Sequence, residues 1–142
     1  MKRTLGKQFL ASLLLCTGGL AASLGSAQAS VRVGGWSLTA DGQIVQGFNY
    51  TGHCPANLKF AWGVIGNAPD TVAYSFSRSD GAHSGPKEAN LPKANQSVPV
   101  YEEWHLGAAT PQFKNYKGWV ELHVASPNAL TKKVNFTLHC NG

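Results

Sequence analysis

Apolar and polar residues alternate along much of the chain, and this period of two predicts β-strands. Because successive side chains of a strand point to opposite faces, the apolar residues of each run share one face. Four such runs have apolar faces made of Leu58, Phe60, Trp62 and Val64; Val72, Tyr74 and Phe76; Val120, Leu122 and Val124; and Val134, Phe136, Leu138 and Cys140. A fifth strand is predicted within 97–106, where Val98, Val100 and Trp104 share a face, and one or two more over 31–38 and 43–48.

Turn-forming residues separate these runs. Asp41-Gly42 and Asp80-Gly81 each follow a run, and such dipeptides tolerate the positive φ angles that tight hairpins require. Further breaks fall at 66–70 and 126–128, both of which contain Asn and Pro. Residues 82–97 hold two prolines and little alternation, so this stretch predicts a long loop or a poor edge strand.

No helical periodicity occurs after residue 29, so the pattern predicts an all-β domain of roughly six to eight short strands. The economical arrangement is a two-sheet sandwich of about seven antiparallel strands, because each apolar sheet face must be buried against another. A small β-barrel is the alternative that the same pattern allows.

Residues 1–29 have the organisation of a secretory signal peptide. Lys2, Arg3 and Lys7 precede an apolar stretch over 9–20, and Ala27-Gln28-Ala29 supplies a small-x-small cleavage site. The short basic region and this cleavage site are typical of bacterial leaders. We therefore expect residues 30–142 to form a single exported domain, periplasmic or secreted, with no membrane span after cleavage.

Charge and cysteine content fit this compartment. The chain has 12 Lys and Arg against seven Asp and Glu, but three of the basic residues lie in 1–29, which leaves a net charge of +2 without a basic stripe. Nucleic-acid binding is therefore not expected. Cys54 and Cys140 remain after cleavage, and an even pair in an exported chain favours a disulfide. Free thiols or metal ligands are the alternatives, although neither cysteine has a C-x-x-C partner.

A set of short motifs resembles a loose group of small exported bacterial proteins with immunoglobulin-like β-sandwiches. The motifs are Cys54-Pro55, residues 74–82 (YSFSRSDGA), Trp104, Gly118-Trp119-Val120, Pro127-Asn128 and residues 136–140 (FTLHC). The resemblance covers about residues 54–140 and implies an immunoglobulin-like fold and export, with no established activity. The sequence departs from the group at 83–97, where a regular strand is expected.

The sequence around Arg78-Ser79-Asp80-Gly81 has two interpretations. An Arg–Asp pair on a loop is suited to binding an anion or to acid–base chemistry. Alternatively, Arg78 lays its aliphatic stem on aromatic surface with its charged head in water, and Asp80-Gly81 makes the turn. We favour the turn and keep Arg78 as a weak candidate for binding.

Candidates for metal binding or catalysis are weak. Glu103 with His105, and Glu121 with His123, each place a carboxylate and an imidazole on one strand face. These four residues form a metal site only if their strands are neighbours in one sheet. No motif of a hydrolase or metalloprotease occurs, so we expect no enzymatic activity and no cofactor.

Aromatic residues on the outer faces of strands give the better functional clue. Trp119 and Tyr101 point away from the predicted core, and His123 and His139 lie on outer faces as well. Such surfaces suit sugar stacking or protein contact. We therefore expect a non-enzymatic binding module for an envelope or extracellular partner, protein or glycan. A periplasmic metal-binding protein and a structural component of a surface assembly are the alternatives.

Overall fold

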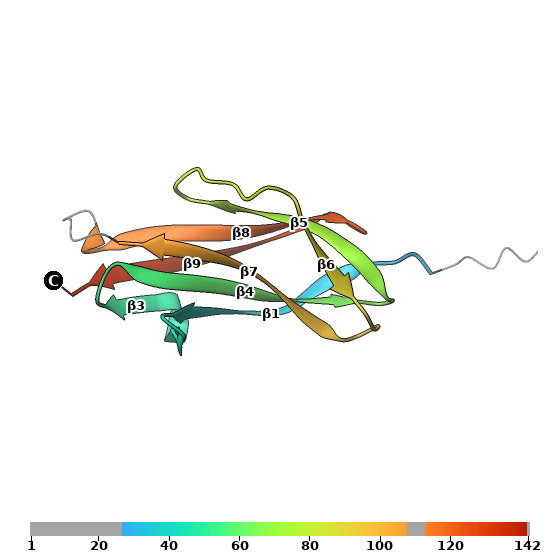
Figure 1. Ribbon diagram of the computed structural model, residues 1–142, viewed down its shortest axis with the longest axis horizontal. Helices are drawn as coiled ribbons and strands as arrows, with labels where there is room; N and C mark the ends of the chain where they lie inside the picture. Colours follow the sequence, from blue (N-terminus) through green and yellow to red (C-terminus); the bar gives the residue numbers. More distant parts are fainter. Residues whose placement is uncertain (1–26, 108–112, 142) are drawn as a thin grey trace, which may run out of the picture.

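The computed structural model describes residues 27–107 and 113–141, and these residues form mainly strands joined by turns (Figure 1). The elements are β1 (Val31–Ala40), β2 (Gln43–Ile44), η1 (Gln46–Phe48), β3 (Asn49–Gly52), β4 (Ala56–Gly66), β5 (Asp70–Arg78), β6 (Lys87–Leu91), β7 (Ser97–Leu106), β8 (Tyr116–Ser126) and β9 (Leu130–Cys140). The all-β prediction is confirmed. Within the described ranges, no helix has the length and apolar character needed to cross a membrane. The signal-peptide prediction falls mostly on residues 1–26, outside the described part.

The strands divide between two sheets, which is consistent with a β-sandwich. Sheet A has the order β2-β1-β4-β7, and sheet B has the order β3-β9-β8-β5-β6. The predicted number of about seven strands, all antiparallel, was too simple: the described chain has nine, and β3 runs parallel to β9. The predicted strand over 43–48 is also wrong beyond Ile44. Gly47 and Phe48 adopt left-handed backbone angles there, and the chain passes from sheet A to sheet B.

The inward faces are those that the alternation predicts. Trp62 of β4 packs against Phe76 of β5 with 5.2 Å between ring centroids, and Phe60 packs against Phe136 of β9 at 5.0 Å. Each pair joins the two sheets. All but three of the predicted inward residues are buried; Tyr74, Val98 and Cys140 are half-buried and pack against the core.

Residues 82–97 contain an edge strand, as one of the two predictions for this stretch proposed. β6 is five residues long and pairs only with β5 among the described strands. A tight turn precedes it, in which the Gly81 amide donates to the Arg78 carbonyl at 3.0 Å and the Arg78 amide donates to the Ala82 carbonyl at 3.0 Å. The turn prediction for Asp80-Gly81 is confirmed, and Gly81 has φ +86°.

The predicted disulfide between Cys54 and Cys140 is present, with Cα atoms 5.5 Å apart. Cys54 precedes β4 of sheet A, and Cys140 ends β9 of sheet B, so the bridge links the two sheets at one end of the molecule (Figure 1). Gly107 packs against this bridge: a Cβ there would lie 2.9 Å from the Cys54 Sγ.

Candidate functional site

The outer face of sheet B carries a row of side chains that alternation places away from the core. Trp119 of β8 lies opposite Asn135 of β9, and Lys117 lies opposite Thr137. Thr137 is in turn the register partner of Asn49 on β3. Three strands therefore bring an indole, two amides, a hydroxyl and an ammonium group onto one surface.

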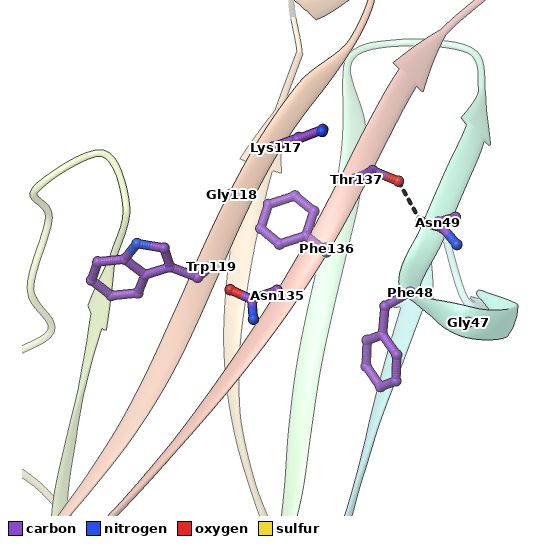
Figure 2. A pocket seen from close by; sticks show the side chains of 9 residues that line it. All are labelled: Gly47, Phe48, Asn49, Lys117, Gly118, Trp119, Asn135, Phe136 and Thr137. Carbon is purple, nitrogen blue, oxygen red and sulfur yellow. Dashed lines mark hydrogen bonds between the residues drawn. The ribbon is translucent and has the colours of Figure 1, made fainter.

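These side chains surround a shallow depression of about 440 Å³, here called the sheet B hollow. Its lining residues are Gly47, Phe48, Asn49, Lys117, Gly118, Trp119, Asn135, Phe136 and Thr137. Figure 2 shows Trp119 to one side, on β8, and Phe48 to the other, beside β3, with the Asn135 amide between them. The hollow thus combines two aromatic rims with a floor on which polar side chains lie beside Gly118 and Phe136.

Hydrogen bonding leaves much of this floor available. The Thr137 hydroxyl donates to the Asn49 Oδ1 at 2.6 Å, which orients that amide (Figure 2). The Asn135 side chain is exposed and makes no hydrogen bond with another residue of the described ranges. The Lys117 ammonium has no ion-pair partner within the same ranges. A ligand in the hollow therefore meets polar groups whose bonding capacity is mostly unused.

Trp119 is half-buried and held from two directions. Its backbone amide donates to the Ser79 Oγ at 3.1 Å, and its carbonyl accepts from the Ser79 amide at 3.0 Å. The Lys133 ammonium lies 4.3 Å from the centroid of its ring and 3.9 Å from the Glu121 Oε2. The lysine braces the indole through a cation–π contact but does not line the hollow.

Phe48 reaches the hollow through an unusual backbone. Its φ is +59°, directly after Gly47 at +61°, and a bulky residue in this region costs about 1–3 kcal/mol. The sequence alone did not predict this contribution. Phe48 and Asn49 lie near Thr137 only through the parallel pairing of β3 with β9, and 88 residues separate Asn49 from Thr137. The alternation pattern carries no signal for such a long-range parallel pair.

The other predicted site residues do not gather around the hollow. Tyr101 lies on the outer face of sheet A, 46% exposed, with the Lys59 ammonium 3.9 Å from its ring centroid. Trp119 and Tyr101 therefore lie on opposite faces of the molecule. His139 is on the outer face of sheet B, and its Nδ1 lies 3.0 Å from the Asn115 Oδ1.

The four residues of the metal alternative are divided between the sheets. Glu103 and His105 are on β7 of sheet A, and Glu121 and His123 are on β8 of sheet B. The condition that their strands be neighbours is not met. Over the ranges 27–107 and 113–141, no group of three His, Cys, Asp or Glu side chains is arranged to hold a metal ion.

His123 contacts Glu121, which shares its strand face, and also Ser77, which sequence reasoning missed. The Ser77 Oγ lies 2.7 Å from the His123 Nε2, and the Glu121 Oε1 lies 3.2 Å from the same nitrogen. A nucleophilic triad instead needs the serine on one ring nitrogen and the acid on the other. The cluster therefore does not have triad geometry, and Ser77 itself is 7% exposed.

The tight turn begins at Arg78, and the side chain of this residue reaches the edge of the core. Its Nη2 is 3.0 Å from the Asp80 Oδ2, and its guanidinium carbon is 4.6 Å from the Trp104 ring centroid. Burial by itself raises the pKa of Asp80. The hydrogen bonds from the Ala82 amide and the Arg78 side chain outweigh this effect, so that the pKa lies below its ordinary value of 3.8. The arginine is thus engaged within the protein and is separated from the hollow.

Comparison with known proteins adds no relative: no protein-family model matches the chain, and no curated protein matches it.

Proposed function

We propose that the chain is an exported, non-enzymatic binding module with an immunoglobulin-like fold, which recognises an envelope or extracellular partner through the sheet B hollow. The observation that carries the proposal is the hollow itself, where aromatic rims flank polar side chains with unused hydrogen-bonding capacity. Binding sites typically combine apolar lining with a few placed polar groups in this way.

Export is supported by two features. Residues 1–29 have the basic, apolar and small-x-small regions of a leader, and Cys54 forms a disulfide with Cys140. Disulfides persist in oxidising compartments such as the periplasm and the extracellular medium.

The immunoglobulin-like assignment is supported by the order of the strands. β1-β4-β7 of sheet A corresponds to strands A, B and E of that fold, and β9-β8-β5-β6 of sheet B corresponds to G, F, C and C′. The position of the disulfide differs from the antibody layout, in which the bridge joins strands B and F. Here the centre of the core is filled by Trp62 against Phe76 instead.

Sheet B is preferred over sheet A because of the chemistry of its surface. Sheet A also has a shallow depression, of about 420 Å³, which the 50% exposed Trp36 lines, but most of its other lining residues are glycine, alanine, serine and proline. The exposed Tyr101 does not line that depression. Small side chains provide few hydrogen-bonding groups at a distance from the backbone, so this face is less suited to a specific contact.

A capture experiment with matched variants tests the proposal. The mature domain is immobilised and exposed to the envelope fraction and culture medium of its own source. Trp119→Ala is compared with Tyr101→Ala, since each removes an outer-face aromatic residue braced by a lysine. We expect Trp119→Ala to lose the captured partner and Tyr101→Ala to retain it. Equal retention by both variants, or loss only with Tyr101→Ala, would show that sheet B is not the binding face.

A further inference from the structure

We infer that the ligand of the sheet B hollow is a carbohydrate, with one sugar unit seated between Trp119 and Phe48. This inference rests on the proposed function and adds the chemical class of the partner. The volume of about 440 Å³ lies at the small end of ligand sites, which span about 300–1,000 Å³. The hollow is therefore large enough for one or two sugar rings.

The polar floor presents two donor–acceptor pairs, which is the pattern that neighbouring hydroxyl groups of a sugar require. A single amide offers one oxygen that accepts and one nitrogen that donates, so Asn135 can bind two adjacent hydroxyls. The second pair is Thr137 with Asn49. The Thr137 hydroxyl donates to the Asn49 Oδ1 at 2.6 Å, so the threonine oxygen remains an acceptor and the Asn49 amide nitrogen remains a donor.

The rims suit the other side of a sugar ring, which is lined by C–H groups. Trp119 and Phe48 flank the Asn135 amide in Figure 2, and aromatic rings provide large, flat apolar surface for such contacts. The Lys133 ammonium, 4.3 Å from the Trp119 ring centroid, fixes the indole in place from outside the lining of the hollow. Lys117 adds a cation at the margin, where an acidic sugar would gain a further contact.

The strands β8 and β9 under the hollow offer no free backbone to an extended peptide, although β3, which carries Asn49, is an edge strand of sheet B. Peptides that add to a sheet use free backbone amides and carbonyls. Here the Trp119 amide and carbonyl both bond to Ser79. The strand that carries Thr137, β9, is paired on both sides, with β8 and with β3. A ligand over these residues meets side chains instead of a free strand edge.

The test uses the mature, disulfide-bonded domain and defined oligosaccharides in titration calorimetry. Three probe classes are used: neutral hexose oligomers, N-acetylhexosamine oligomers and hexuronate oligomers. We expect at least one class to bind, and Asn135→Leu to weaken that binding by about tenfold or more, since it removes both polar groups at similar volume. Asn57→Leu, an exposed asparagine on sheet A, is the matched control and is expected to bind like the wild type. Thermal melts confirm that each variant is folded.

The outcomes separate this inference from the proposed function. If no probe class binds but the wild type captures a protein from the envelope through Trp119, the carbohydrate inference is overturned and the proposed function stands. If a probe binds equally well to wild type and Asn135→Leu, the sugar site lies elsewhere and the assignment to the hollow is wrong. If a sugar probe binds the wild type, and Asn135→Leu weakens that binding while Asn57→Leu does not, both the carbohydrate inference and the proposed function are supported. If hexuronate oligomers bind more strongly than the neutral oligomers, and Lys117→Met removes this difference, the ligand is an acidic sugar.

Discussion

The Arg78 guanidinium, at the end of β5 in sheet B, reaches across to β7 of sheet A. In addition to its pair with Asp80, its Nη1 lies 3.7 Å from the Glu102 Oε1 on β7, and the Lys87 ammonium of β6 lies 3.6 Å from the other Glu102 oxygen. The Glu102 side chain is only 13% exposed, and that of Arg78 is 20% exposed. The expectation that the arginine head reaches open water is therefore only partly met. Glu102 sits at the rim of the core without a bulge in its pairing with β4, so the charges lie at the edge where the two sheets meet.

The turn that follows Arg78 depends on the backbone of Gly81. Gly81 has φ +86°, and a Cβ placed there meets no atom within 4 Å, so only the backbone opposes a side chain. Gly81→Val is expected to lower the free energy of unfolding by about 1–3 kcal/mol. Gly85→Val is the control, because its surroundings are equally open and its φ lies outside the left-handed range. Urea denaturation of both variants checks this; equal stability of the two would contradict the role of φ.

The charge of Asp80 makes a pH-dependent contribution to stability. Its pKa in the folded protein lies below the ordinary value of 3.8, so the ionised form is stabilised by folding. This contribution is fully present above pH 3.8 and is lost as the pH falls through the lower folded pKa. The stability difference between wild type and Asp80→Asn should therefore be constant near neutral pH and shrink in strong acid. Its size should stay under about 1 kcal/mol, since the pair is partly exposed. Thermal melts across this range measure it, and a difference that grows in acid would contradict the assignment.

At the scale of elements, the period-two pattern predicts the long strands but not the short crossing segment. The faces of β4, β8 and β9 were predicted because burial against one core imposes strict alternation on a long strand. η1 and β3 were not predicted, because left-handed residues at 47 and 48 and a parallel pairing distant in sequence leave no periodic signal. The alternation of β8 therefore indicated Trp119 as an outer-face residue. The positions of Phe48 and Asn49 beside the hollow became known only from the structure.

The packing between β8 and β9 depends on a missing side chain at Gly118. A Cβ there would lie 2.7 Å from the Tyr116 Cε1 and 2.8 Å from the Phe136 Cζ. Phe136 is in turn held by Phe60 and Trp104, with ring centroids 5.0 and 5.6 Å away, so its ring has little freedom to move. Gly118→Ala is expected to cost about 1–3 kcal/mol of stability through overpacking.

Gly35→Ala provides the control for this prediction. Gly35 is also a strand glycine, but no atom lies within 4 Å of a Cβ built on it. Because alanine is preferred over glycine in a strand by about 0.5–1 kcal/mol, this variant should be neutral or slightly more stable. Chemical denaturation of the two variants beside the wild type gives the comparison. A Gly118→Ala protein as stable as Gly35→Ala would mean that the Phe136 ring is free to shift.

At the scale of the whole molecule, export and the disulfide depend on each other. If the leader over 1–29 is removed as proposed, N-terminal sequencing of the protein isolated from cells should begin at Ser30. A leader that is cut there delivers Cys54 and Cys140 to an oxidising compartment, where the bridge can form. Isolation of a form that retains residues 1–29 would remove the argument for export.

The bridge between Cys54 and Cys140 spans 86 residues of sequence, and it closes the end of the molecule where β3 meets β9. Such a cross-link restricts the unfolded chain, and its removal from a small exported domain typically costs about 2–5 kcal/mol. Cys54→Ser and the double variant Cys54→Ser/Cys140→Ser should therefore both unfold at lower urea concentration.

Gly52 pairs with Cys140, and the Asn141 amide donates to the Gly52 carbonyl at 2.8 Å, so β3 should be the first strand to loosen in these variants. Hydrogen exchange of the β3 amides should accelerate more than that of the β4 amides, and binding at the sheet B hollow should weaken with it. Labelling of both cysteines in the native, unreduced protein, or equal exchange in β3 and β4, would count against this role of the bridge.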